Sequence, residues 1–223
     1  MALCSTAPAW KHVTCRIDPR RTLSGSDRGR KPVARQRLHL GRFRLIHDHV
    51  LIDRLSQLPT ETFSGSVFRA TRRSLDPTTP SVAGGRWSPT DGPAVLYASF
   101  LREGALAEIA FHWAQFDPRP TKPAVVHRMG VRSDRTLRLM RSTLEGLGIS
   151  AGRYKDPNYR RTQEIGAAAS FIGCDGLIVP SARWDCENLI LFTDNLAMDI
   201  VLEVHNAEEV DWQAWAKDVG LLR

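Results

Sequence analysis

Residues 84–108 constrain the fold of this chain more than any other stretch of its sequence. The segment begins Gly84-Gly85-Arg86-Trp87-Ser88-Pro89 and continues through a turn at residues 91–93. Residues 94–99 then form a short apolar segment typical of a strand, and residues 101–116 form a helical pattern that Asp117-Pro118 ends. Because adjacent glycines let the backbone pass close to a ligand, we expect a loop–strand–helix unit with a binding site at its loop.

The other segments mix helical and strand patterns without regular alternation. A helix is expected at residues 45–58, where apolar residues recur at helical spacing, and Asp156-Pro157 is expected to begin a helix that runs to about residue 172. The remaining expectations are strands at 66–71, 124–131, 176–179, 188–192 and 200–205, irregular chain at 132–155, and a closing helix at 207–217. This order predicts an α+β fold, a compact mixed α/β body.

The positive charge of the chain is concentrated in its first fifth. The net charge is +7, but residues 1–44 hold eleven Lys and Arg against two Asp, which is +9, so residues 45–223 carry −2. Residues 1–44 also lack periodicity, which predicts a disordered basic extension ahead of a folded domain at 45–223. The extension is open to four interpretations: a solvated segment without a role, an arm that binds nucleic acid weakly, a docking segment, or a transit peptide.

Several classes of protein and site are disfavoured. No apolar run is long enough to span a bilayer. Four cysteines (Cys4, Cys15, Cys174 and Cys186) form no C-x-x-C pair, so we expect neither a disulfide framework nor a zinc site, and a reducing cytoplasm is the expected location. Neither a dinucleotide-binding glycine fingerprint nor a P-loop follows a strand, and Ser181 is not in a G-x-S-x-G elbow.

Four side chains suggest a pocket for an anionic ligand that contains a ring. Arg69 and Arg86 can bind phosphates, Tyr97 can contact a base, and Glu108 can hold ribose hydroxyls or a developing cation. Each has a structural alternative: a surface ion pair for the arginines, a core position for Tyr97, and a carboxylate paired with arginine for Glu108. The helix that carries Glu108 is expected to bury one stripe, formed by Leu101, Ala105, Ile109, Trp113 and Phe116.

Six blocks of the chain, in this order, resemble the RES domain, the toxin component of bacterial RES/Xre toxin–antitoxin systems. A common Arg-Trp-Asn-Pro form of that family is Arg86-Trp87-Ser88-Pro89 here. The blocks are Phe68-Arg69, Gly84-Gly85-Arg86-Trp87, Leu96-Tyr97-Ala98-Ser99 with Ala107-Glu108, Thr162-Gln163, Val179-Pro180-Ser181-Ala182-Arg183, and Asn188-Leu189-Ile190-Leu191-Phe192.

The resemblance implies a fold like that of ADP-ribosyltransferase toxins and cleavage of the nicotinamide–ribose bond of NAD⁺. ADP-ribose would pass to inorganic phosphate or water, with NAD⁺ as a substrate and no bound cofactor. By position, the resemblance implies catalytic roles for Arg69, Tyr97 and Glu108. It implies substrate-binding roles for Gly85, Arg86, Trp87, Ser181 and Asn188.

The family also implies a partner, an Xre-like antitoxin, in a toxin–antitoxin hetero-oligomer; a homo-oligomer is the other expectation, and nucleic acid would be contacted indirectly through the antitoxin. Two alternative functions stay open at this point. One is an ADP-ribosyltransferase that modifies a specific protein. The other is a non-catalytic nucleic-acid-binding module that uses residues 1–44.

Overall fold

The computed structural model describes residues 47–198, 200 and 202–222. The predicted extension at residues 1–44 lies outside this range, and the boundary at residue 45 stays a prediction. The described helices are α1 (His49–Ser56), α2 (Arg102–Trp113), α3 (Arg141–Gly146), α4 (Arg160–Phe171) and α5 (Trp212–Asp218), with a 3₁₀ turn at Ala151–Arg153. The described strands are β1 (Thr60–Arg72), β2 (Val95–Ser99), β3 (Ala124–Arg138), β4 (Gly176–Pro180), β5 (Glu187–Phe192) and β6 (Glu203–Val210).

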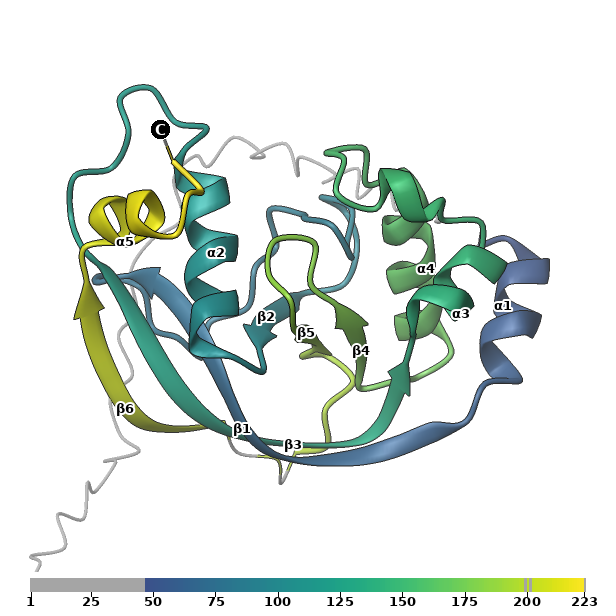
Figure 1. The fold of residues 1–223 in the computed structure, drawn as a ribbon. Helices are drawn as coiled ribbons and strands as arrows, with labels where there is room; N and C mark the ends of the chain where they lie inside the picture. Colours follow the sequence, from purple (N-terminus) through teal and green to yellow (C-terminus); the bar gives the residue numbers. More distant parts are fainter. Residues whose placement is uncertain (1–46, 199, 201, 223) are drawn as a thin grey trace, which may run out of the picture. The chain divides into compact units, whose positions relative to one another are not determined.

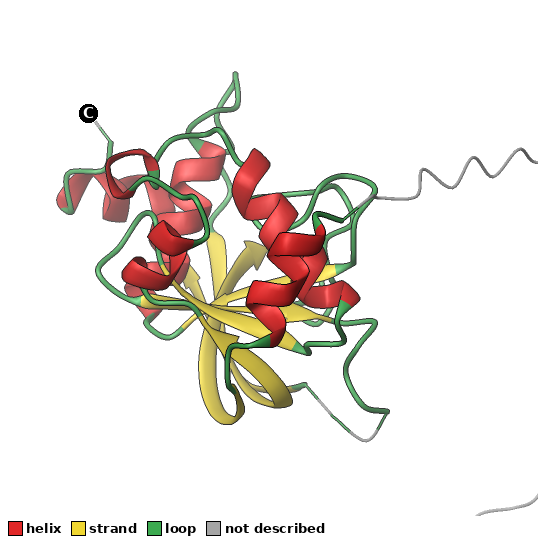
Figure 2. Ribbon diagram, turned by 90° about the vertical axis from the view of Figure 1, so that its right-hand side faces the viewer, coloured by secondary structure: helices red, strands yellow, loops and turns green. Residues whose placement is uncertain are grey.

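The six strands form one strongly curved sheet. The long strands β1 and β3 pair antiparallel over most of their length, and β6 pairs with the other edge of β3. The short strands β2, β5 and β4 also pair antiparallel, in that order. Phe68 of β1 pairs with Ser99 of β2, while the end of β3 pairs parallel with β4, so the sheet returns on itself. In Figure 2 the long strands curve below the helices.

Period-two alternation sorts the strand side chains into three apolar clusters. One lies inside the curved sheet and includes Val67, Leu96, Met129, Ile178 and Leu189. The residues between them on the same strands point outward to the helices. The second cluster joins β2, β4 and β5 to α1, α3 and α4, and the third joins β1 and β3 to α2 and α5. Figure 1 shows α2 and α4 on opposite sides of the short strands.

The predicted strand and helix types are right for most segments, but the following placements are wrong. Residues 132–138, predicted as irregular, continue β3. Buried Ser133 and Thr136 hydrogen-bond to each other at 2.6 Å, which masks the apolar alternation expected of a strand. The helix predicted from Asp156-Pro157 begins at Arg160, whose N–H bonds to Asn158 Oδ1. The last strand runs over Glu203–Val210, not 200–205, and takes in part of the predicted closing helix. The sequence did not indicate this strand because its side chains are exposed along most of its length and therefore show no apolar alternation.

The predicted buried stripe of α2 is right in its middle and wrong at its ends. Ala105 is buried, and Ile109 and Trp113 pack partly buried against the third cluster, whereas Leu101 and Phe116 are 44% and 48% exposed. The fully buried positions are small residues and Leu106, in the run Gly104, Ala105, Leu106, Ala107 and Ala110. The cause is that α2 has apolar neighbours on one side and a cavity on another. Among the described residues, no helix is long and apolar enough to cross a membrane.

Candidate active site

A cavity of about 500 Å³ lies beside α2, above the neighbouring strands β2 and β5. Ala105, Glu108, Ile109 and His112 line it from α2, at the i, i+3, i+4, i+7 spacing of one helix face. Leu106 and Ala110, on another face, pack into the cluster with α5. The opposite wall consists of residues 84–87 and Tyr159, which precedes α4. We call this space the central cavity.

Glu108 is held on its wall by two uncharged donors. Its Oε1 accepts a hydrogen bond from Ser181 Oγ at 2.8 Å and another from Asn188 Nδ2 at 2.9 Å. Within the described part of the chain, both bonds end on Oε1 and Glu108 has no salt bridge, so the charge stays available to a ligand. The structural alternative of a carboxylate paired with arginine is therefore not what this part of the chain shows.

Ser181 and Asn188 come from the two ends of the β4–β5 connection. Ser181 Oγ also accepts from the N–H groups of Arg183 and Trp184, at 3.1 and 3.2 Å, so its hydroxyl both builds the turn and reaches Glu108. Ser181 is buried and lies behind Glu108, whereas Asn188 lines the central cavity. The buried Oδ1 of Asn188 has no hydrogen-bond partner in the described part of the structure.

The glycine loop packs directly on Tyr97. A Cβ at Gly85 would lie 2.6 Å from the Tyr97 hydroxyl oxygen, so only glycine fits without displacement. That oxygen accepts the Trp87 N–H at 3.2 Å, and Gln163 of α4 donates to the Gly85 carbonyl at 2.9 Å. Trp87 is buried in the core that includes α4. Gly85, Trp87 and Tyr97 thus form one rigid wall of the cavity.

Arg86 is held by carbonyl oxygens and tyrosine rings. Its Nη1 donates to the Tyr154 carbonyl at 2.7 Å, and its guanidinium carbon lies 4.4 Å from the centre of the Tyr159 ring and 5.3 Å from that of Tyr154. Stacking and backbone bonds orient the group without cancelling its charge. Sequence reasoning missed both tyrosines, because their contact with Arg86 depends on the tertiary fold.

Arg69 lies at the edge of the cavity, apart from the Glu108 network. It is 9% exposed, its Nη2 donates to the Thr79 carbonyl at 2.8 Å, and its buried Nη1 has no partner among the described residues. Burial lowers its pKa to about 10, with Asp76 opposing that shift, so it is cationic at neutral pH. His127, opposite Arg69 in the β1–β3 register, has a pKa lowered by burial and by Arg69.

Burial also sets the pKa values of two tyrosines: Tyr97 in the wall of the central cavity, and Tyr154, whose carbonyl holds Arg86. It raises the pKa of Tyr97 to about 12, although the Trp87 N–H and Arg86 pull in the other direction. It raises the pKa of Tyr154 to about 12 as well. Both phenols are therefore neutral over the physiological range. They can donate or accept hydrogen bonds but cannot serve as anionic bases.

A family model described as the RES domain matches residues 62–213, which confirms the resemblance stated from the sequence. Among solved structures, a chain of the M. tuberculosis MbcT–MbcA toxin–antitoxin complex is similar, with a TM-score of 0.67 and 18% identity. The match covers 76% of this chain and 97% of that one, and it confirms the predicted fold class. No curated protein sequence matches the chain.

Proposed function

This chain belongs to the RES domain family, and from that premise we propose that it is a toxin enzyme that cleaves the nicotinamide–ribose bond of NAD⁺. The ADP-ribose would pass to inorganic phosphate or water. NAD⁺ is then a substrate, and the chemistry needs no bound cofactor. One observation carries the proposal: the carboxylate of Glu108 and the guanidinium of Arg86 lie on opposite walls of the central cavity, and neither forms an ion pair with another described residue.

Glu108 supplies what this bond cleavage requires. When the C1″–N bond breaks, its electron pair stays on the nicotinamide nitrogen, and positive charge develops on the ribose, as in glycoside hydrolysis. A carboxylate already oriented by Ser181 and Asn188 stabilises that charge without reorganising. Nicotinamide leaves as a neutral molecule, so the mechanism needs no strong general acid. An oxygen of phosphate or water then forms the new bond to C1″.

The opposite wall suits the rest of the dinucleotide. The fork of Arg86 fits the pyrophosphate, to which it would donate two hydrogen bonds. Tyr97 and Trp87 fix the position of the loop, and the neutral Tyr97 phenol would contact the nicotinamide ring. The unpartnered Oδ1 of Asn188 is an acceptor for a ribose hydroxyl or for the carboxamide of nicotinamide.

Arg69 is proposed as a contact for the incoming anion. Its side chain lines the rim of the central cavity, and one nitrogen is already committed to Thr79. The other, Nη1, is buried without a partner in the described structure, a costly state that an anionic oxygen would relieve.

We also propose an antitoxin as partner. The similar solved structure is a toxin–antitoxin complex by its description, and an antitoxin of the Xre type covering the central cavity would keep the enzyme inactive in the cytoplasm. Co-purification of the chain with the product of an adjacent gene, followed by loss of NAD⁺ turnover in the complex, tests this partner.

The enzymatic proposal is tested by incubating the full chain with NAD⁺, with and without inorganic phosphate. We expect release of nicotinamide, faster with phosphate, and ADP-ribose-1″-phosphate as product. Free ADP-ribose alone would indicate hydrolysis. Labelled NAD⁺ added to a cell lysate distinguishes transfer to a protein, which would give a modified band. If nicotinamide is released under none of these conditions, the proposed function is wrong.

A further inference from the structure

A second cavity of about 490 Å³ adjoins the central cavity on the α4 side. The two share one lining residue, Arg86, whose side chain forms the wall between them. We call the second space the arginine cavity, because Arg86, Arg153, Arg160 and Arg161 all line it. It is built from residues 148–158 and the first turn of α4, and the mechanism proposed above makes no use of it.

The charges of the arginine cavity do not balance. Its four guanidinium groups face two carboxylates, those of Asp156 and Glu164. Arg160 and Arg161 share Glu164, at 3.2 and 2.9 Å, and Arg161 also lies 3.9 Å from Asp48 outside the cavity. The side chain of Arg153 makes no ion pair or hydrogen bond within the described residues. A concave surface with excess cationic charge attracts an anion.

The arrangement suits a phosphate in particular. Guanidinium forks match the oxygens of phosphate and bind them through paired hydrogen bonds. Arg160 and Arg161 also begin the twelve-residue helix α4, where Asn158 Oδ1 accepts the N–H of Arg160 and the N-cap residue Tyr159 makes no side-chain capping bond. The positive end of the helix dipole therefore adds to the field of the arginines.

A third cavity beside the site has walls of a different kind. It adjoins the central cavity on the other side, at Arg69 and Ile109, and has a volume of about 970 Å³. Although basic side chains also line it, its walls include Trp113, Phe116 and several prolines. An apolar wall suits a ring or an aliphatic group better than a doubly charged ion.

We propose that the arginine cavity binds a phosphate dianion beside the dinucleotide. The identity of the neighbouring ligand rests on the proposed function. Two sources supply this chemistry. One is free inorganic phosphate. The other is the 2′-phosphate of NADP⁺: if Arg86 holds the pyrophosphate at the shared wall, the adenosine ribose reaches the arginine cavity.

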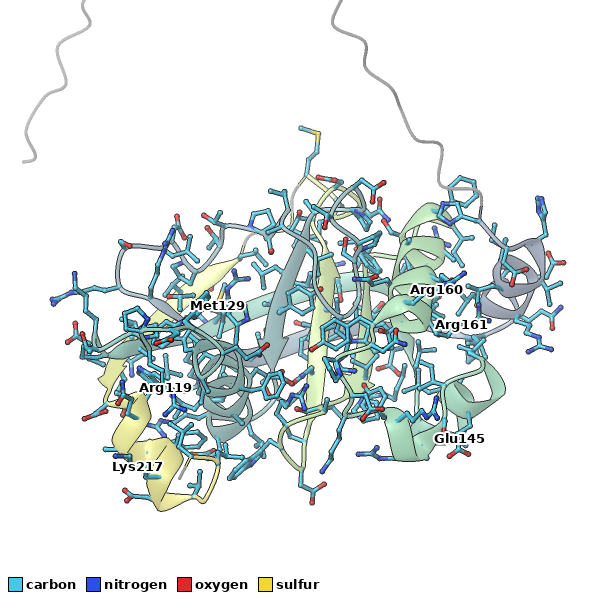
Figure 3. All side chains as sticks on the ribbon, turned by 90° about the horizontal axis from the view of Figure 1, so that it is seen from above. Arg119, Met129, Glu145, Arg160, Arg161 and Lys217 are labelled. Atoms are coloured by element: carbon cyan, nitrogen blue, oxygen red, sulfur yellow. The ribbon has the colours of Figure 1, made fainter. Side chains whose placement is uncertain are left out.

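The test measures binding to the full chain by calorimetric titration, with inorganic phosphate and 2′-AMP as probes and adenosine as the blank. The variant is the double substitution Arg153→Gln and Arg160→Gln. Arg119→Gln is the control for the loss of an exposed arginine, and it is matched in charge to the single variant Arg153→Gln. Figure 3 shows Arg119 far from Arg160 and Arg161, on the side of Lys217. We expect the double variant to bind at least one probe about tenfold more weakly or worse, which is the loss typical of a charge-assisted hydrogen bond. The control should leave the affinity for both probes unchanged.

The affected probe identifies the source. Weaker binding of inorganic phosphate alone indicates a site for free phosphate, weaker binding of 2′-AMP alone indicates the phosphate of NADP⁺, and weaker binding of both indicates a site open to either. Unchanged binding of both probes, or an equal loss in Arg119→Gln, would overturn the proposal. Thermal unfolding checks the fold, and Arg153→Gln alone replaces the double variant if that variant is unstable. Because the readout is binding, a chain that never cleaves NAD⁺ can still confirm this site.

Discussion

Charged side chains in the central cavity and on the surface of the sheet are held in opposite ways. On the sheet, Arg138 of β3 forms ion pairs with two carboxylates, those of Glu61 and Glu187, which together neutralise its positive charge. In the cavity, Glu108 accepts hydrogen bonds from a hydroxyl and an amide, and Arg86 donates to backbone carbonyls and stacks on tyrosine rings.

The difference separates a structural charge from a functional one. An ion pair neutralises its own field, whereas neutral partners fix the position of a charge and leave its field intact. Glu108 and Arg86 stand on facing walls and each lacks a counter-charge among the described residues. A ligand that carries both a developing cation and a pyrophosphate would supply the two missing charges.

The largest effect is expected from Glu108→Gln, which removes the charge and keeps the shape. The glutamine carbonyl can still accept from Ser181 and Asn188, so the thermal unfolding temperature should not change. The rate of nicotinamide release should fall by about a hundredfold to a thousandfold, the range found when one group that stabilises transition-state charge is lost. Turnover close to that of the unmodified chain would show that Glu108 is not catalytic.

Arg86→Gln should act on substrate binding rather than on the chemical step. Losing the guanidinium removes two charge-assisted hydrogen bonds to the pyrophosphate, so KM should rise by about tenfold to a hundredfold with a smaller change in kcat. Arg86→Lys is the matched comparison, because it keeps the charge and loses the planar fork. Steady-state kinetics with NAD⁺ distinguish these cases, and a change confined to kcat would contradict the assignment.

Ser181→Ala tests whether the hydroxyl acts through Glu108. Asn188 still holds the carboxylate in this variant, so we expect a loss in kcat of about tenfold, the value of one hydrogen bond to a charged group. In a Glu108→Gln background the same substitution should cost little more, because both changes act on one step. Equal losses in both backgrounds would mean that Ser181 has only its structural role in the turn.

The sequence predicts local features well and distant contacts poorly. β2 and β5 lie where apolar residues cluster, and the fold class follows from the order of such segments. Ser181 and Glu108 are 73 positions apart, and no local pattern indicates that one hydroxyl turns toward that carboxylate. The same holds for Tyr159 and Arg86. The polar end of β3 was missed because its buried side chains, Ser133 and Thr136, are hydroxyls that hydrogen-bond to each other. A strand prediction that relies on alternating apolar residues does not recognise such positions as buried.

The buried tyrosines Tyr97 and Tyr154 should give a smaller effect, at alkaline pH. The pKa values of Tyr97 and Tyr154 are about 12 in the folded chain, above the ordinary value of 10.0 that applies when the chain is unfolded. Between these values the folded chain retains protons that the unfolded chain has lost, so stability falls as pH rises through this window. Ultraviolet titration of the three tyrosines should show two with late transitions. Two early transitions would mean that water reaches these rings.

The smallest effect is expected from Arg138→Gln, which removes the ion-paired arginine on the surface of the sheet. Its ion pairs are well exposed, so their loss should lower the free energy of unfolding by only about 0.2–1 kcal/mol, and less at high salt. NAD⁺ turnover should not change, because Arg138 does not line the central cavity and its positive charge is already neutralised by carboxylates. Denaturant unfolding and steady-state kinetics measure both quantities. If the substitution altered kcat as strongly as Ser181→Ala, charge cancellation would no longer explain which charged residues serve catalysis.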